Sequence, residues 1–303
     1  MWLRFNIHAS SNGFRRVAEV WAAYFERSGT LKEVSKTICR GTHDIQVAQS
    51  NPEGGIKMGT CEWGKGFTHG SLQTKGQTLQ WDLKFETGLE GKFKVVPDFY
   101  GRTGILKSVL ETPREDLQFN GTVTVNGRAV EFRNAPGMHS HFSGPRNGHS
   151  WTWVHSNSFV DEQGNEAPMV FEGLTSRTHF FGKFLTPRIS AFYFLYRGRE
   201  HIFNTFWSAV FSRSKLSFGN WTFRMDKQDL SFRGEAKAEL KDFAGMTFED
   251  TDGSLIYHSS SVLSDLTLHV YRQGKIESSY FSKGSATYET ASRERSPYVQ
   301  VLI

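Results

Sequence analysis

The chain has 303 residues, with 36 Lys and Arg against 31 Asp and Glu, and a formal net charge of +5 at pH 7. The basic residues are scattered and form no block of like charge, so we expect no nucleic-acid partner. The same charge is compatible with peripheral contact at an anionic membrane surface. No run approaches the ~20 apolar residues that a membrane-spanning helix needs.

Two cysteines, Cys39 and Cys61, lie in separate expected strands without metal-ligand or redox spacing. We therefore expect two buried thiols in a reducing compartment, and we expect the protein in the cytoplasm. The first residues lack the order of a signal peptide and begin directly in a strand pattern. That beginning is compatible with a natural start upstream of Met1.

Short alternating runs of β-branched and aromatic residues, with 26 Phe and only 8 Pro, predict an all-β protein. The segment Arg15–Phe25 has helical length but alternates in polarity, so we interpret it as a strand. Asn126-Gly127 and Arg197-Gly198 predict tight hairpin turns. In chain order, the first expected strands are Trp2–Ile7, Val17–Glu26, Glu33–Cys39, Asp44–Ala48, Ile56–Trp63, Ser71–Thr74 and Thr78–Glu86.

The second half of the chain resembles the first half. Asp229–Phe243 can be aligned with Gly70–Phe85, and further along Gly274 falls on Gly127. The repeat predicts two tandem antiparallel barrels, an N-terminal one over residues 1–195 and a C-terminal one over residues 196–303.

The same alignment predicts a final strand, Tyr298–Ile303, opposite Trp151–Ser156 of the first copy. The final strand carries neither histidine nor tryptophan. We therefore expect the histidine and tryptophan side chains to belong to a site in the first barrel and not to the shared scaffold.

The window Gly137–Asn157 contains four of the eleven histidines and two of the eight tryptophans of the chain. On a strand, side chains two residues apart share a face, so Trp151, Trp153, His155 and Asn157 would line up along one wall. A barrel of about eight strands can hold a small ligand. The candidate ligand-binding residues are Trp81, His139, His141, Arg146, Trp151 and Trp153.

Several segments together resemble a known superfamily. They are WLRF, AEVWAAYF, TKGQTLQWDLKF, PGMHSHFSGPRNGHSWTWVHSNSF and VFEGLTSR. In this order they are similar to the tandem lipocalin-like proteins that include AttH-like proteins, carotenoid 1,2-hydratases (hydroxyneurosporene synthase), tocopherol cyclases and fungal Diels-Alderases. The resemblance implies two lipocalin-like barrels, an apolar ligand and, in enzymatic members, metal-free hydration or cyclisation of isoprenoid or polyene substrates.

Acid-initiated addition suits such a wall, because aromatic faces stabilise a developing carbocation. Glu172 shares a strand face with Val170 and Leu174, and apolar neighbours raise the pKa of a carboxyl group, so it is the candidate acid. The alternative is that Glu172 pairs with Arg146 or Arg177. His155 is the candidate proton donor or acceptor, with Asn157 orienting it or the substrate, and the alternative is an interior histidine bonded to backbone.

Two other functions stay open at this point. A non-catalytic carrier of a hydrophobic molecule would use the same pocket. A zinc site could form from His139 and His141 with His155 or His149, but no carboxylate is spaced to orient these ligands, so we expect no metal. The sequence contains no nucleotide-binding loop and no nucleophile elbow, and we expect no cofactor.

Overall fold

The computed structural model describes residues 1–13, 15–28, 33–51, 55–87, 93–95, 108–180, 184–205, 212–227 and 229–302. Regular structure within these ranges is β-strand, apart from two single-turn 3-10 helices, η1 (Ile45–Val47) and η2 (Leu240–Asp242). Every strand pair is antiparallel, so the predicted all-β class is confirmed. No helix in the described ranges has the length and apolar character to cross a membrane.

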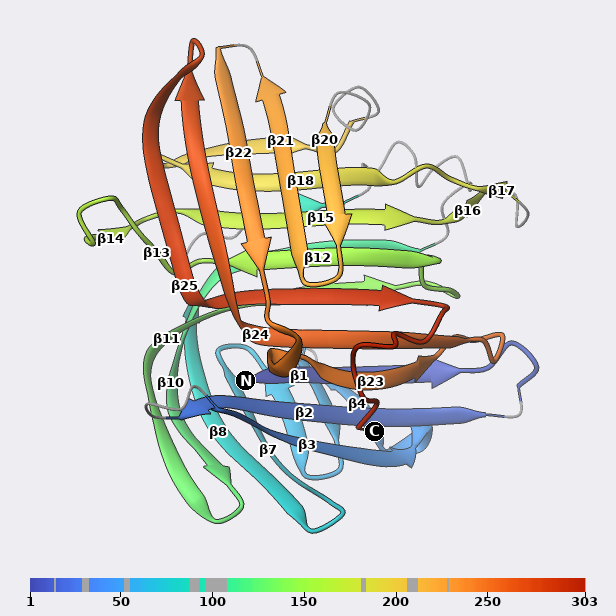
Figure 1. Ribbon diagram of the computed structural model, residues 1–303. Helices are drawn as coiled ribbons and strands as arrows, with labels where there is room; N and C mark the ends of the chain where they lie inside the picture. The colour runs from blue at the N-terminus through green and yellow to red at the C-terminus, as the bar shows by residue number, and fades with distance from the viewer. Residues whose placement is uncertain are drawn as a thin grey trace.

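The N-terminal part of the chain forms two of the sheets (Figure 1). The smaller sheet consists of β1 (Trp2–Ala9), β2 (Arg16–Ser28) and β3 (Glu33–Asp44). The larger has the order β11-β10-β8-β7-β6-β5-β4, with β9 beside β10. Its strands are β4 (Ala48–Asn51), β5 (Gly55–Met58), β6 (Cys61–Gly64), β7 (Phe67–Thr74), β8 (Gln77–Thr87), β9 (Phe93–Lys94), β10 (Val109–Val125) and β11 (Arg128–Ser143).

The rest of the chain builds a large sheet with the order β19-β18-β15-β12-β25-β24-β22-β21-β20, and β13, β14 and β23 pair beside this path. Its strands are β12 (Ser150–Ser156), β13 (Phe159–Val160), β14 (Glu166–Ala167), β15 (Val170–Arg177), β18 (Ile189–Tyr196), β19 (Arg199–Phe203), β20 (Arg213–Ser217), β21 (Asn220–Lys227), β22 (Leu230–Lys237), β23 (Ala244–Glu249), β24 (Leu255–Arg272) and β25 (Lys275–Ser292). A separate hairpin is made of β16 (His179–Phe180) and β17 (Phe184–Leu185).

Strand β2 is buried on both faces, as its nearly unbroken apolar sequence requires. Val20, Ala22 and Tyr24 face the N-terminal core, where they join side chains from β7, β8 and β10. Trp21 points the other way and packs with Phe248 of the large sheet, with ring centroids 5.2 Å apart. The strand therefore joins the two halves of the molecule through apolar contact.

A second core fills the C-terminal half with aromatic rings from β15, β18, β21 and β22. Phe171 stacks on Phe223, with ring centroids 5.0 Å apart, and Phe194 stacks on Phe232 at 4.3 Å. Offset or edge-on ring pairs add stability beyond the apolar area they bury. This core lies behind the strands that carry the candidate site.

Local sequence explains the hairpins. Asn126 and Gly127 have φ of 49° and 85°, as the two central positions of a type I′ turn require, and they join β10 to β11. Arg197-Gly198 joins β18 to β19 in the same way, so both predicted turns are confirmed.

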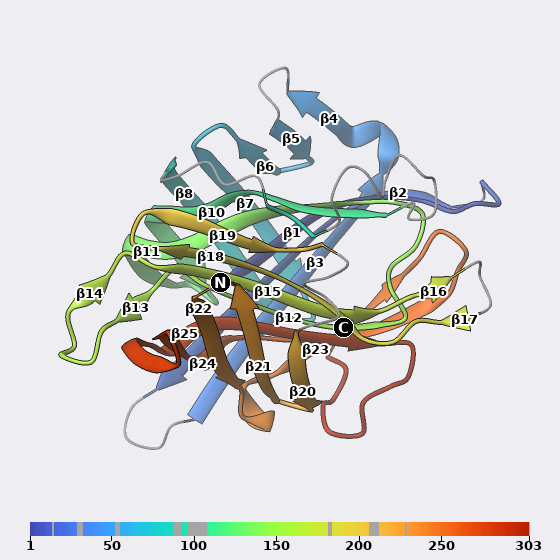
Figure 2. The same ribbon diagram turned by 90° about the horizontal axis from the view of Figure 1, so that it is seen from above.

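The long hairpin β24–β25 changes register between Ser261 and Leu266, and both strands bend at that level (Figure 1). The outer part of β24 pairs with β22 and its inner part pairs with β23, while the inner part of β25 pairs with β12. Figure 2 shows the molecule from above, with β10 and β11 on one side of β12, β15 and β18, and with β20 to β22 on the other side of these three strands. Bulges of this kind let one hairpin serve two differently oriented parts of a sheet.

Several local expectations were wrong. Asp44–Ala48 is largely the single turn η1, because the Asp44 side chain accepts a hydrogen bond from the Gln46 backbone and closes a turn. Ile56–Trp63 is two strands, since Gly59 has φ of 60° and reverses the chain. The expected final strand is irregular over its described residues, 298–302, with one bridge from Val301 to Gly245, so these residues offer no counterpart to β12.

The internal repeat is present in another register. The hairpin β24–β25 matches β10–β11, with Gly274 at the turn position of Gly127. However, β22 pairs with β24 as β8 pairs with β10, so Leu230–Lys237 corresponds to β8 and not to the β7 segment at Gly70.

Hydrogen bonding places the change of sheet between β11 and β12, because β12, β15 and β18 share a sheet with β24 and β25. The expected boundary after Leu195 lies inside β18. The division of the chain into two folding units at residue 195 stays a prediction.

Candidate functional site

A row of polar side chains crosses three adjacent strands of the large sheet. His155 on β12 stands directly opposite Glu172 on β15, and Glu172 stands directly opposite Tyr193 on β18. Opposed residues on neighbouring strands point to the same face. All three are buried, with exposed fractions of 3%, 0% and 1%. The pairing of β12 with β15 therefore brings two of the candidate catalytic residues, His155 and Glu172, to one face of the sheet.

Strand β10 covers this row from the N-terminal half of the molecule. Its Glu115, 1% exposed, lies over His155, whose Nε2 is 2.9 Å from the Glu115 carbonyl oxygen and 3.7 Å from Oε2. A carbonyl oxygen only accepts, so Nε2 carries the proton and donates it to the backbone. Burial lowers the pKa of His155 to about 4, which leaves the imidazole neutral at neutral pH.

Trp153 connects the aromatic wall to the row. Its indole Nε1 donates a hydrogen bond of 2.6 Å to Oε1 of Glu172, entirely out of water. Its ring lies parallel to that of His155, with centroids 6.0 Å apart and an interplanar angle of 9°. The predicted wall therefore holds the predicted acid directly through a hydrogen bond.

Glu115 and Glu172 form a buried carboxyl pair. Burial, and then the nearby Glu172 carboxylate, raise the pKa of Glu115 well above its usual range, and burial also raises the pKa of Glu172. No Lys or Arg of the described chain forms an ion pair with either group. Because two adjacent carboxylates out of water repel each other strongly, the pair retains a proton, and the proton lies on Glu115.

Three oxygens of this pair have no hydrogen-bond partner among the described residues: both carboxyl oxygens of Glu115, and Oε2 of Glu172. Thr112 and the protonated Glu115 lie near enough to Glu172 to favour its ionised form, and neither carboxyl group has any other donor on these three oxygens within the described ranges. Buried polar atoms are nearly always bonded, so three unbonded oxygens in one place indicate a functional site.

Aromatic side chains close the end of the row at Tyr193. The Tyr193 hydroxyl donates to Oε1 of Glu200 over 3.0 Å, and burial, reinforced by this bond, raises the pKa of Tyr193. Phe93 of β9 is fully buried against it, with ring centroids 5.7 Å apart. The carboxyl pair thus lies between apolar rings, Trp153 on one side and Tyr193 with Phe93 on the other.

Asn157 lies one residue beyond the end of β12 and serves another purpose. Its side-chain nitrogen is 2.8 Å from Oδ1 of Asp116, 3.0 Å from the Gly137 carbonyl and 3.2 Å from the Leu117 carbonyl. These contacts fasten β12 to the β10–β11 hairpin. The structure therefore places Asn157 as a strut that positions β10, and not beside the His155 ring.

Two predicted ligand-binding tryptophans lie elsewhere. Trp81 is part of the N-terminal core, where its indole donates to Oγ1 of Thr68 over 3.1 Å. Trp151 shares the face of Trp153 but leans toward His258, with ring centroids 6.3 Å apart.

Trp151 thereby borders a second polar cluster on the same sheet face. Glu289 accepts hydrogen bonds from the Trp2 indole at 2.8 Å and lies 3.1 Å from Nε2 of His258. His258, together with the hydrogen bond from Trp2, outweighs burial and lowers the pKa of Glu289. Because this carboxylate is well bonded, the cluster fits a structural joint between β1 and the large sheet.

The remaining predicted residues belong to the β10–β11 hairpin and the loop that follows it. His139 stacks on Trp63, with centroids 4.7 Å apart, and burial lowers the pKa of His139 to about 4. His141 is exposed opposite Glu111. Arg146 makes an ion pair of 3.5 Å with Asp252.

Neither alternative pairing at the site is formed in the described part of the chain. Arg146 pairs with Asp252, and Arg177 donates from Nε to the Thr186 carbonyl over 3.1 Å, so neither neutralises Glu172. The three-histidine zinc site is not assembled either, because no group of three His, Cys, Asp or Glu in the described residues is placed to hold a metal. Cys39 and Cys61 are free and buried, as expected.

Sequence reasoning missed Glu115. It lies in the charged run ETPRED, which is typical of a solvated surface, and it is far from Glu172 along the chain. Register shifts on either side of Arg114 in β10 turn Glu115 toward the large sheet. Only the packing of β10 on β12 and β15 makes it part of the site.

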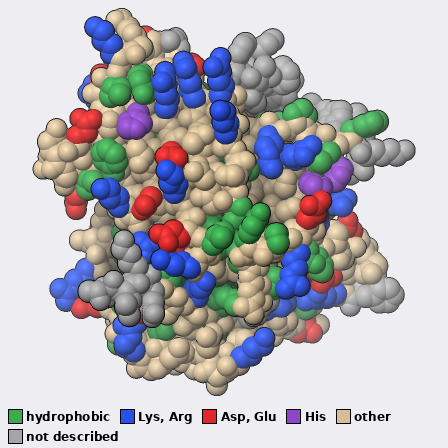
Figure 3. All heavy atoms as spheres, viewed as in Figure 1, with side chains coloured by type: hydrophobic (Ala, Val, Ile, Leu, Met, Phe, Trp, Pro, Cys, Tyr) green, Lys and Arg blue, Asp and Glu red, His purple; other side chains and the backbone are tan. Residues whose placement is uncertain are grey.

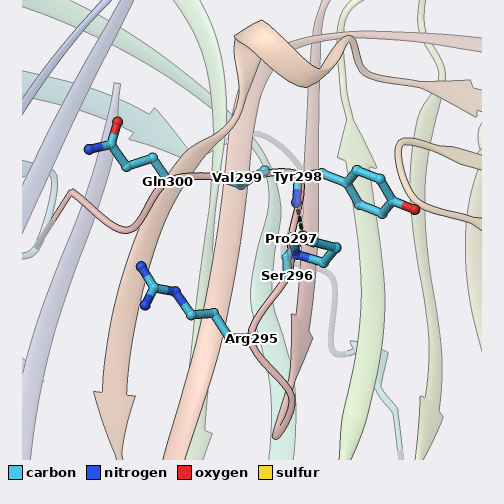
Figure 4. Close-up of a pocket in the computed structure, with 6 residues that line it drawn as sticks. All are labelled: Arg295, Ser296, Pro297, Tyr298, Val299 and Gln300. Carbon is cyan, nitrogen blue, oxygen red and sulfur yellow. Dashed lines mark hydrogen bonds between the residues drawn. The ribbon is translucent and has the colours of Figure 1, made fainter.

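A surface hollow of about 400 Å³ lies at the C-terminal segment, lined by residues 295–300 (Figure 4). Arg295 and Gln300 point to one side of the segment and Tyr298 points to the other. The hollow contains no buried titratable group, so it is a weaker candidate than the carboxyl pair.

The sequence matches no protein-family model, and the search of curated proteins found no significant relative. Among solved structures, kievitone hydratase from Nectria haematococca is similar over 96% of this chain and 88% of its own, with a TM-score of 0.51 and 9% identity. A protein provisionally named AttH from Nitrosomonas europaea covers 98% of this chain and 86% of its own, with a TM-score of 0.49 and 10% identity. The fold expected from the sequence resemblance is confirmed.

Proposed function

We propose that this protein catalyses proton-initiated hydration or cyclisation of a small hydrophobic molecule, with Glu115 and Glu172 as the acid and base. The supporting observation is the buried carboxyl pair, which has an indole donor on one oxygen and, among the described residues, no ion-pairing Lys or Arg and no N–H donor on its other three oxygens. Such a pair is costly for folding, and a raised carboxyl pKa is what a general acid needs near neutral pH.

In the proposed reaction, the protonated Glu115 gives its proton to one carbon of an alkene, and the neighbouring carbon becomes a cation. A water molecule then adds to the cation and loses a proton to the carboxylate pair, which restores the starting state of the protein. In a cyclisation, an internal double bond or hydroxyl replaces the water and the same pair takes up the released proton. Both routes are balanced without a metal or a redox cofactor.

The neighbouring rings suit the cationic intermediate. Trp153 donates to Glu172 from the edge of its indole, and Tyr193 stands opposite Glu172 on β18, so both rings are close to the pair. Aromatic faces attract a cation, most strongly when water is excluded, and in the proposed reaction the cation lies over one of these faces. His155 is neutral and adds no positive charge that would oppose the intermediate. Its role in this proposal is to hold β10 through the Glu115 carbonyl, as a positioning residue.

The fold agrees with this proposal without proving it. The similar solved structure is named a hydratase, and a hydratase adds water across a double bond. Because the identity is 9%, the likeness concerns the fold, and the chemistry has to be tested on this chain.

Native mass spectrometry and lipid extraction of protein from its own host would first identify a copurified hydrophobic molecule. Turnover of that molecule and related polyenes is then followed in D₂O with wild type, Glu115→Gln and Glu172→Gln. We expect one deuterium on the protonated carbon, and a rate loss of 10²-fold or more in either variant, on the order of one general acid–base contribution.

Glu277→Gln is the matched control, because Glu277 pairs with Arg197 and Arg272 at the surface. It should leave turnover unchanged. A bound molecule with no turnover in the wild type would favour a non-catalytic carrier. Turnover that survives both Glu115→Gln and Glu172→Gln would contradict the assigned acid.

A further inference from the structure

A ladder of basic side chains crosses the outer face of the large sheet, away from the carboxyl pair. Arg213 on β20 stands directly opposite Arg224 on β21, and Arg224 directly opposite Arg233 on β22. The next strand continues the ladder with His269. Figure 3 shows Lys and Arg side chains gathered over β20, β21 and β22.

The alternation of β21 and β22 forces this ladder into solvent. Phe223 and Phe232, next to the ladder positions, are buried in the C-terminal core, so Arg224 and Arg233 must point outward. Strands in a sheet lie ~4.8 Å apart, and like charges directly opposite each other destabilise a sheet. Three arginines in one row therefore lower stability unless an anion is bound there.

The ladder is only partly neutralised by the described residues. Arg224 pairs with Asp226 over 3.0 Å, and within the described ranges Asp226 is the only carboxylate that forms an ion pair with the row. Arg233 lies over the ring of Tyr271, 4.0 Å from its centroid, and its Nε has no hydrogen-bond partner in the described chain. Arg213 is exposed and forms no ion pair within the ranges that the structure describes.

An apolar group adjoins the ladder. Ile276 on β25 is the cross-strand partner of Tyr271 and is 57% exposed at the tip of the β24–β25 hairpin. Tyr271 in turn pairs with Ser231, two residues from Arg233. The ladder thus ends beside an exposed isoleucine and a tyrosine, a combination that suits the boundary between lipid headgroups and acyl chains.

We propose that the face formed by Arg213, Arg224, Arg233 and His269, with Tyr271 and Ile276 at its tip, binds the headgroups of acidic phospholipids at a membrane surface. The guanidinium groups bind phosphate or carboxylate oxygens, and Ile276 enters the headgroup boundary. This inference rests on the outer face alone and does not depend on the proposed acid chemistry.

A nucleic acid fits these observations less well. Single-strand binders combine a basic groove with aromatic rings on which bases stack, but the ring of Tyr271 is already covered by Arg233. Exposed Ile276 gains nothing from a polyanion in water, whereas it gains from contact with acyl chains. Mobile headgroups can also adjust to the narrow spacing of the strands.

The test compares binding of the full chain to phosphatidylserine–phosphatidylcholine vesicles and to phosphatidylcholine vesicles, at low and high salt. We expect binding only to the acidic vesicles, weakened by salt. The triple variant R213Q/R224Q/R233Q should lose affinity by about 100-fold, since each basic residue near an acidic surface contributes a several-fold factor. The variant should fold, because it removes repulsion between opposed charges.

The matched control is K57Q/K65Q/R133Q, which removes the same charge from exposed positions elsewhere. It should retain most of the affinity, because it leaves the ladder intact. A loss as large as that of the ladder variant would overturn the proposal, since net charge alone would then explain binding. Equal binding of wild type and ladder variant to acidic vesicles would overturn it as well.

The variant Ile276→Ser distinguishes binding to a membrane surface from binding to a soluble polyanion. We expect roughly a ten-fold loss on acidic vesicles from the lost apolar contact, and no change in binding to single-stranded DNA. If wild type binds single-stranded DNA more tightly than vesicles, and Ile276→Ser changes neither, the partner is a nucleic acid and the lipid assignment is wrong.

Discussion

Glu172 and His155 face each other directly across the β12–β15 pair, and burial shifts the pKa of each toward its uncharged form. Burial raises the pKa of the carboxyl and lowers the pKa of the imidazole to about 4. A neutral imidazole cannot stabilise a carboxylate as an ion pair, so the two do not form a salt bridge at neutral pH. The ionisation of this site instead depends on the second carboxyl, Glu115, which keeps the proton of the pair and leaves the negative charge on Glu172.

We predict that Glu115 makes the protein less stable as the pH rises. Its folded-state pKa lies above the ordinary value of 4.5, so its contribution to stability is complete below 4.5 and is lost as the pH passes through the raised pKa. Urea unfolding across this range should show a falling free energy of unfolding for wild type and a flatter curve for Glu115→Gln. Parallel curves would show that the carboxyl ionises without cost.

We predict the opposite dependence for His155. Its folded-state pKa of about 4 lies below the ordinary 6.5, so its stability contribution is present above 6.5 and lost as the pH falls through about 4. The loss should reach about 3 kcal/mol, and His155→Gln should reduce it. Urea unfolding at several pH values measures the slope. Exposed His141→Gln is the control, and an unchanged slope in His155→Gln would refute the prediction.

The hydrogen bond from Trp153 to Glu172 should contribute more to the free energy of unfolding than a hydrogen bond between two neutral groups. Trp153→Phe keeps an aromatic ring but removes the donor to Glu172, so we expect a loss of about 1–3 kcal/mol in the free energy of unfolding. The matched variant is Trp221→Phe, whose indole donates over 2.6 Å to the neutral hydroxyl of Ser214. It should cost less, and a cost equal to that of Trp153→Phe would indicate that Glu172 carries no charge.

Gly121, at the bulge in β10, should be the glycine of the β10–β11 hairpin whose substitution costs the most stability. Gly121 has φ of 137°, and a Cβ there would lie 2.1 Å from the Asp82 carbonyl oxygen. Gly121→Ala should therefore cost several kcal/mol, beyond the ~1 kcal/mol expected from the backbone angle alone. Gly127→Ala, where a Cβ meets nothing within 4 Å, isolates the angle. Thermal unfolding of both variants makes the comparison, and equal costs would mean that β8 moves aside.

The local sequence pattern predicts the structure correctly where residues close in the chain decide the backbone conformation. Asn126-Gly127 makes its turn because both positions accept positive φ, and no distant contact is needed. Arg15–Phe25 extends as a strand because its two faces meet two different cores. The same alternation placed Trp153 and His155 on one face of their strand.

The pattern failed where distant strands meet. Trp81 and Trp153 look alike in sequence, but Trp81 points into the N-terminal core and donates to Thr68, while Trp153 donates to Glu172. Asn157 looked like a partner of His155, but lies past the end of β12 and holds the β10–β11 hairpin. The surroundings of these side chains depend on where each strand ends and on how it is aligned with its neighbours.

The sequence by itself determined the all-β class, the hairpin turns and the face that Trp153 and His155 share on their strand, because these follow from side-chain alternation and backbone angles over a few residues. Glu172 joins that face only through the pairing of β15 with β12. Only the tertiary structure decided which charges lose contact with water. Glu115 reads as part of a solvated run, yet the packing of β10 on the large sheet buries it beside Glu172. Whether a side chain is buried depends on which other strands pack over it. The order of the strands and the positions of the bulges decide that packing.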